Sequence, residues 1–138
     1  MIGLDTNVLA RYYVASSDAP SQLQSAAAQK LLESGKRLFV SKSVVLELEW
    51  VLRGYYKSPP EDVLVVLDHL LAIPHLEVED RVAVEMAVAA LREGFDFADA
   101  LHHGSARHCT SMATFDDKRF ARRATQKGWK PPVKLVAN

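Results

Sequence analysis

The sequence has a single cysteine, Cys109, among 138 residues, so it has no disulfide framework and cannot build a thiolate metal site from its own chain. It also has no net charge, because 17 basic residues balance 17 acidic ones. There is therefore no overall basic excess of the kind that indicates a nucleic-acid partner. No uninterrupted apolar run approaches the length of a bilayer span, and no basic, hydrophobic leader precedes the first structured residues. We therefore expect a protein of the reducing cytoplasm with no membrane segment.

Several catalytic signatures are missing as well. There is no GxGxxG or GxxxxGK[ST] loop for a nucleotide, and no GxSxG turn for a serine nucleophile. Cys109 falls in a predicted helix, where we expect a packed thiol. Asp99 and His103 share one helix face and could bind Zn²⁺, but two ligands do not make a zinc site. We expect His102 and His103 to be surface or hydrogen-bonded histidines, and their role at any site is open.

The composition fits one globular domain over residues 1–138, since 49% of the residues are hydrophobic and 25% are charged. The charge is distributed unevenly along the chain. Residues 61–99 carry ten acids and two bases, whereas residues 118–138 carry seven bases and no acid. Such asymmetry indicates a polyanion or an acidic partner, and a solvated helix face followed by a basic tail explains it equally well.

Short apolar runs alternate with helical patterns along the chain. The runs predict five strands, at residues 2–4, 38–40, 76–78, 111–115 and 133–136. Between them, we expect Ser41 or Ser43 to cap a helix that runs to about Tyr55, and Ser58 to open a capping box with Glu61. Asp80 is expected to cap the next helix, which ends near residue 94. This alternation favours a parallel α/β sheet covered by helices on both faces, with right-handed crossovers.

Carboxylates follow two of the predicted strands. Asp5 ends the first strand, and Asp116 and Asp117 directly follow the fourth. In an open parallel sheet, ligands bind beyond the carboxyl ends of the strands, so these side chains could share one rim. Asn7 is expected to orient Asp5 or to cap the following helix.

Two further acids stand inside predicted helices. Glu47 has no cation three or four residues away, whereas Glu49 has Arg53 at i+4 and is expected to form a surface pair. This contrast singles out Glu47, because an unpaired acid on an apolar helix is costly unless it binds something. Asp99 lies in the first turn of a later helix.

Each acid also has a purely structural explanation. Asp96 is a helix cap, Asp99 is a first-turn acid favoured by the helix dipole, and either Asp116 or Asp117 is a cap. Glu47 could simply be solvated. The alternative is that four acids from four separate segments bind a hard divalent cation, Mg²⁺ or Mn²⁺, which prefers carboxylate and water oxygens. The substrate most often served by such a site is a phosphodiester.

Four segments of the sequence resemble the acidic motifs of PIN-domain ribonucleases. They are Met1-Ile2-Gly3-Leu4-Asp5-Thr6-Asn7-Val8-Leu9, Val44-Val45-Leu46-Glu47-Leu48-Glu49-Trp50-Val51-Leu52, Asp96-Phe97-Ala98-Asp99-Ala100-Leu101 and Thr114-Phe115-Asp116-Asp117-Lys118-Arg119-Phe120. They occur in the family's order and at similar spacing, and the likeness covers the whole chain. The chain looks most like the VapC-type toxin of a toxin–antitoxin pair.

The resemblance implies a three-layer α/β/α fold with a five-stranded parallel sheet. It also implies a Mg²⁺- or Mn²⁺-dependent endoribonuclease. Such a protein would form a homodimer and be neutralised by a small antitoxin. The resemblance further implies hydrolysis of an RNA phosphodiester by a metal-bound hydroxide, with Asp5 and Asp99 as principal ligands and Glu47 and Asp116 binding directly or through water. Candidate contacts to ligands or phosphates are Thr6, Asn7, Thr114 and Asp117, and the suspected RNA-backbone contacts are Lys118, Arg119, Arg122 and Arg123.

Three rival interpretations remain at this point. The chain could be a PIN-type RNA-processing nuclease that is not a toxin, a different metal-dependent phosphoesterase, or a non-catalytic α/β interaction module whose acids are only helix caps.

Overall fold

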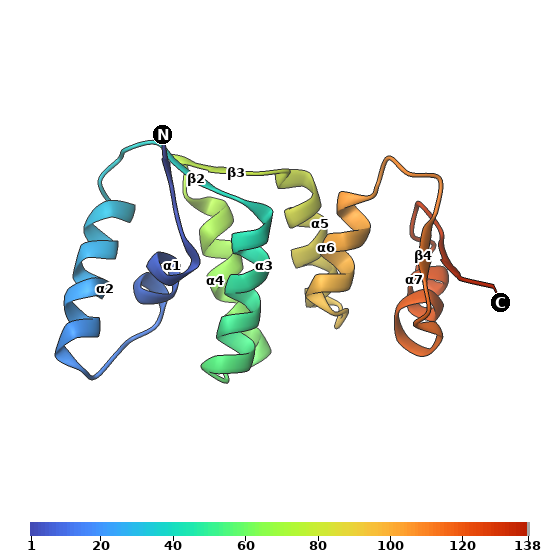
Figure 1. Cartoon of the computed structure of the whole chain (residues 1–138), viewed down its shortest axis with the longest axis horizontal. Coiled ribbons are helices and arrows are strands. Elements are labelled where there is room, and N and C mark those ends of the chain that lie inside the picture. The colour runs from blue at the N-terminus through green and yellow to red at the C-terminus, as the bar shows by residue number, and fades with distance from the viewer. Residues whose placement is uncertain (138) are drawn as a thin grey trace.

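The computed structural model describes residues 1–137 and has an α/β architecture. Figure 1 shows the helices arranged side by side along the long axis of the molecule, with β2 and β3 at one end of them. The strands and helices, in chain order, are β1 (Ile2–Gly3), α1 (Thr6–Tyr13), α2 (Ala19–Leu32), β2 (Leu38–Val40), α3 (Lys42–Trp50), the π-helix η1 (Val51–Tyr55), α4 (Pro60–Ala72), β3 (Leu76–Val78), α5 (Arg81–Arg92), α6 (Phe97–Ser105), β4 (Met112–Thr114), the π-helix η2 (Asp117–Ala121), α7 (Arg122–Gln126) and β5 (Val133–Leu135). Within residues 1–137, no helix combines the length and the apolar character needed to cross a membrane.

The strands form two separate parallel sheets. The first has the order β1-β2-β3, with Ile2 opposite Leu38 and Leu38 opposite Leu76. The second contains β4 and β5, with Met112 opposite Val133. The expectation of parallel strands is therefore confirmed, but the expectation of one five-stranded sheet is wrong.

β1 and β4 both lie at sheet edges and do not pair with each other. β1 is only two residues long and both of its residues are exposed. β4 instead pairs with β5, in a C-terminal unit with a small core of its own around Phe120 and Ala124. Trp129 packs against this core and also against the main core, where its ring stacks on Phe95 at a centroid distance of 4.4 Å.

The main core lies between the first sheet and helices α1 to α6. Its fully buried side chains include Leu9, Leu38, Leu48, Leu70 and Phe97. Burial of such side chains is the main term that holds the elements together, at roughly 1.5–3 kcal/mol for each large apolar side chain. The helices α5 and α6 approach closely, since a Cβ added at Gly104 would lie 3.2 Å from the backbone of Ala83.

Two of the predicted helix ends are confirmed. The Ser41 hydroxyl accepts a hydrogen bond from the backbone N–H of Val44 at 3.2 Å, and the helix continues through η1 to Tyr55. Gly94 follows α5 with a φ of +91°, a left-handed conformation that glycine adopts without strain. The predicted capping box at Ser58 is wrong, because Pro59 precedes α4 and makes no side-chain capping bond.

Asp80 occupies the N-cap position of α5 as expected, but its side chain makes no capping hydrogen bond. Its backbone has a φ of 48°, and its carboxylate accepts ion-pair contacts from Arg107 at 2.7 Å and from Lys42 at 3.0 Å. These two cations, Arg107 first, hold the pKa of Asp80 well below its usual range. The side chain therefore connects the start of α5 to α3 and to the segment after α6.

Candidate active site

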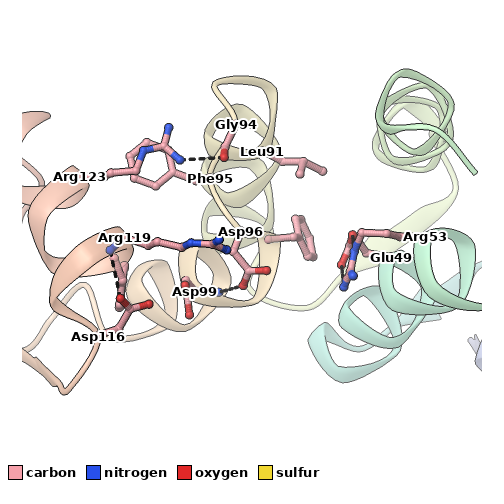
Figure 2. A pocket seen from close by; sticks show the side chains of 12 residues that line it. Glu49, Arg53, Leu91, Gly94, Phe95, Asp96, Asp99, Asp116, Arg119 and Arg123 are labelled. Carbon is pink, nitrogen blue, oxygen red and sulfur yellow. Dashed lines mark hydrogen bonds and ion pairs between the residues drawn. The ribbon is translucent and has the colours of Figure 1, made fainter.

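Four acids line an open cleft of about 710 Å³, called the acidic cleft below. Figure 2 shows that its walls come from α3 and η1 on one side, from α5 and α6 in the centre and from η2 and α7 on the other. The charged side chains of its lining are Glu49, Arg53, Asp96, Asp99, Asp116, Arg119 and Arg123. Four acids and three arginines thus line one cavity, which suits a charged ligand.

Asp99 lies at the centre of this cleft, in the first turn of α6. Asp96 caps the same helix, and its carboxylate accepts a hydrogen bond from the backbone N–H of Asp99 at 3.0 Å. The pKa of Asp99 is raised, first by burial and then by the negative charges of Asp96 and Asp116. Asp99 is therefore a partly buried carboxyl that has two further acids near it.

Asp116 reaches the cleft from the C-terminal unit. Its carboxylate caps η2 by accepting from the backbone N–H of Arg119 at 3.1 Å, and its own N–H donates to the Thr114 hydroxyl at 3.0 Å. Asp117 is exposed, with its nearest cation, Arg122, at 3.9 Å. The expectation that only one of the two aspartates is a cap is confirmed, and the cap is Asp116.

Glu49 was expected to form a surface pair, and the expectation that it lies at the surface is wrong. It is only 3% exposed, and its carboxylate accepts from Arg53 Nε at 2.7 Å and Nη2 at 3.3 Å. The pair with Arg53 was expected, but not its burial. A signal was available, because Val45, Leu48, Glu49 and Leu52 follow the i, i+3, i+4, i+7 spacing of a buried helix face.

Asp5 and Glu47 lie elsewhere, in a second pocket of about 540 Å³ that we call the Asp5 pocket. Asp5 caps α1, and its Oδ1 accepts from the backbone N–H of Thr6 at 2.8 Å. Glu47 is exposed. The complete lining is Asp5, Thr6, Asn7, Ala10, Arg11, Glu47, Val51, Tyr55 and Tyr56. Asn7 lines the same pocket, but the residue that caps α1 is Asp5 and not Asn7, so only the orienting role of Asn7 stays a prediction.

The structure thus brings the four predicted acids together in pairs, Asp5 with Glu47 and Asp99 with Asp116. Carboxylate oxygens are suitable donors for a hard divalent cation. Across residues 1–137, however, no three Asp, Glu, His or Cys side chains are grouped closely enough to hold a metal ion. The donor chemistry fits a divalent cation, but the arrangement does not form the four-carboxylate centre.

The arginines proposed to contact RNA differ in what they already bind. Arg123 donates to the carbonyl oxygens of Gly94 at 2.8 Å and Glu93 at 3.2 Å, and its guanidinium lies 4.2 Å from the ring centroid of Phe95. These contacts connect α7 to the residues that follow α5, so Arg123 has a structural role. Arg119 is exposed and extends across the acidic cleft toward Asp96, as Figure 2 shows. The remaining candidates, Lys118 and Arg122, are exposed.

The structure places both histidines of interest. His103 is 3% exposed, donates from Nε2 to the carbonyl oxygen of Pro131 at 2.8 Å and packs against Trp129 at a centroid distance of 4.8 Å. It is a hydrogen-bonded core residue, whereas His102 is exposed. Cys109 lies beyond the end of α6 and is exposed, so the expectation of a packed thiol within a helix is wrong.

The fold and the two pockets define an α/β protein whose carboxylates and arginines border open clefts. Comparison with protein families identifies it further: the model of the PIN domain matches residues 2–126, so the chain belongs to the PIN domain family. Members of this family are generally metal-dependent nucleases that cleave RNA or DNA. Neither the curated proteins nor the solved structures gave a match to this chain.

Proposed function

We propose that the protein is a Mg²⁺- or Mn²⁺-dependent endoribonuclease and the toxin of a type II toxin–antitoxin pair. It hydrolyses RNA phosphodiester bonds in the cytoplasm and so inhibits translation. Its partners are an RNA substrate, a small antitoxin and a second copy of the chain. The whole of residues 1–138 acts as one nuclease domain. The principal support is the acidic cleft, in which Asp99 and Asp116 face a cavity that also holds Arg119.

The electrostatics of the cleft support a cation requirement. Burial raises the pKa of Asp99 first, and the negative charges of Asp96 and Asp116 raise it further. A divalent cation at such a place supplies charge neutralisation and lowers the pKa of a bound water. We assign Asp99 and Asp116 to cation binding in this cleft, directly or through water, and assign Asp5 and Glu47 to the same task as a second pair in the Asp5 pocket. Thr114 holds the backbone of Asp116 in place for this role.

The Asp5 pocket carries a second indication of binding. The Thr6 hydroxyl is buried and has no hydrogen-bond partner within residues 1–137. An unsatisfied buried hydroxyl costs about 1–3 kcal/mol, and functional sites are where such costs are tolerated. Thr6 and Asn7 border Asp5 and are assigned as contacts to the water or phosphate held there.

The proposal is tested by sequencing RNA ends after controlled expression of the wild type, Asp5→Asn and Asp99→Asn, together with cleavage of the identified RNA by purified protein. We expect new ends only with the wild type, cleavage that requires Mg²⁺ or Mn²⁺, and complete arrest by EDTA. Full cleavage in EDTA, or wild-type cleavage by a folded Asp99→Asn variant, would exclude the proposed chemistry. New RNA ends without growth arrest would instead favour an RNA-processing nuclease that is not a toxin.

A non-catalytic interaction module is the second candidate, and the separation of the acids into two pockets favours it. In that case the acids serve as caps, as Asp5, Asp96 and Asp116 do in the structure. This candidate predicts that divalent cations leave the melting temperature unchanged. The nuclease predicts an increase, because a ligand that binds only the native state stabilises it.

A further inference from the structure

The Asp5 pocket contains an aromatic and cationic wall that none of the catalytic assignments uses. This wall is formed by Arg11 from α1, Tyr55 at the end of η1, and Tyr56. The same lining also holds Asp5 and Glu47. A single pocket therefore combines two carboxylates with a cation and two phenol rings.

Tyr55 is an unusual surface residue because it is 72% exposed although it borders a pocket. Its ring meets Tyr56 edge to face, at a centroid distance of 4.9 Å and an interplanar angle of 85°. Tyr56 is half-buried and anchors this arrangement. An exposed ring held against a fixed neighbour is a surface on which a nucleobase stacks, and such stacking tolerates any base.

Arg11 supplies the positive charge of the same wall. Its Nε donates to Gln24 Oε1 at 2.8 Å and its Nη1 donates to the Tyr56 hydroxyl at 3.2 Å. Within residues 1–137, no carboxylate lies within ion-pair distance of this guanidinium. Arginine has five N–H donors, so several remain for an anionic oxygen. The two hydrogen bonds fix the guanidinium beside the pocket with its charge uncompensated.

We propose that the Asp5 pocket contains a subsite for one nucleotide of single-stranded RNA, whose base stacks on Tyr55 and whose phosphate binds Arg11. The volume of about 540 Å³ lies in the range of small-ligand pockets. This subsite rests on the proposed endoribonuclease function, and it would place the RNA chain next to Asp5.

The test measures equilibrium binding of a fluorescent single-stranded oligoribonucleotide in EDTA, so that cleavage does not enter the result. Tyr55→Ala should weaken binding roughly 5- to 150-fold, the loss expected for one base–aromatic stack. Tyr55→Phe keeps the ring and should bind like the wild type. Tyr55→Leu keeps bulk without a planar ring, so it should bind weakly even if Tyr55→Ala is poorly folded. Trp50→Ala is the matched control, since Trp50 is 57% exposed but does not line this pocket.

A second arm identifies the base and the phosphate. In a series of oligoribonucleotides that each lack one base, the wild type should lose affinity at one position, and Tyr55→Ala should show no further loss there. Arg11→Ala should reduce the slope of log affinity against log salt by about 0.7, one single-strand phosphate contact, and Arg11→Lys should keep most of it.

The outcomes separate this inference from the proposed function. Unchanged binding by both Tyr55→Ala and Arg11→Ala, or no RNA binding by the wild type, overturns the subsite. If both variants bind RNA normally while Asp99→Asn abolishes cleavage, the nuclease stands and the subsite falls. If both variants weaken binding while no divalent cation supports cleavage, the subsite stands and the nuclease falls. A loss that appears only in binding to an antitoxin peptide assigns the wall to a protein and also overturns the subsite.

Discussion

Glu47 and Glu49 stand two residues apart on α3 and face different pockets. Glu47 lines the Asp5 pocket, and Glu49 lines the acidic cleft with Asp99 and Asp116. Residues two apart on a helix point to nearly opposite sides, so the helix itself separates the two pairs of acids. Changing each glutamate separately therefore tests whether an acid of each pocket is needed for cleavage.

We predict that Glu47→Gln abolishes RNA cleavage with little change in stability, because Glu47 is exposed. Glu49→Gln should instead keep cleavage and lower the free energy of unfolding by about 1–2 kcal/mol. The reason is that it removes the buried negative charge that pairs with Arg53. Cleavage rates and urea unfolding of both variants decide this. Loss of cleavage only in a folded Glu49→Gln variant would place the active carboxylate in the acidic cleft.

Asp99→Asn should raise the melting temperature of the metal-free protein at neutral pH. A raised pKa means that the folded chain binds the proton more tightly than the unfolded chain, so the charged form costs stability above the folded pKa. The gain should fade as the pH falls toward about 4, where the carboxyl of Asp99 becomes protonated in the folded and the unfolded chain. Melting curves across this pH range measure it.

The control for this variant is Asp62→Asn in the first turn of α4. Asp62 also lies near a helix N-terminus and is exposed, so its removal should give no gain. If both variants gain equally, the crowding of charge around Asp99 is not the cause.

Local features of this chain were predictable from sequence, and contacts between distant segments were not. The caps formed by Ser41, Asp96 and Asp116 each satisfy a backbone N–H three residues further on, so the pattern contains all the information. Asp80 fits the same pattern, but Lys42 and Arg107 lie far away in sequence and bind its carboxylate instead. A cap pattern cannot reveal such competition.

The prediction of one five-stranded sheet was wrong for a related reason. The apolar runs located all five strands within two residues of their observed ends, since burial acts on each run separately. Which edges pair depends on the helices between them, and β4 found its partner in β5 rather than in β1. The predicted four-acid site assumed one continuous sheet, so its separation into two pockets follows from the same pairing. The burial of Glu49 was readable from the stripe of Val45, Leu48 and Leu52, but its Arg53 partner suggested a surface pair.

Asp80→Asn should lower the free energy of unfolding by about 1–2 kcal/mol at pH 7, because it removes the charge shared by Lys42 and Arg107. Asparagine also adopts positive φ, so the backbone at 48° is kept. The depressed pKa of Asp80 stabilises the fold above the unfolded value of about 3.9 and ceases to do so as the pH falls through the folded pKa. The difference between variant and wild type should therefore shrink in acid below about pH 4.

Urea unfolding at several pH values measures this difference. The matched control is Asp68→Asn, whose partner Arg92 and whose own side chain are both about half exposed, and it should cost under about 0.5 kcal/mol. A constant difference between Asp80→Asn and the wild type at all pH values would show that shape, and not charge, is responsible.

The last prediction concerns the basic residues that follow Asp116. Arg119 and Arg122 are exposed, whereas Arg123 already binds two carbonyl oxygens and the Phe95 ring. If the segment holds RNA, the double variant Arg119→Ala with Arg122→Ala should flatten the dependence of log affinity on log salt by about 1.4, which is 0.7 for each single-strand phosphate contact. Arg123→Ala should leave that slope nearly unchanged and lower the melting temperature instead, because it detaches α7 from α5. RNA binding in EDTA between low and high salt, with melting curves of the same samples, tests both statements. An unchanged slope in the double variant, together with weaker binding of an antitoxin, would assign this surface to the antitoxin. A flattened slope in Arg123→Ala would show that Arg123 gives up its structural contacts to bind RNA.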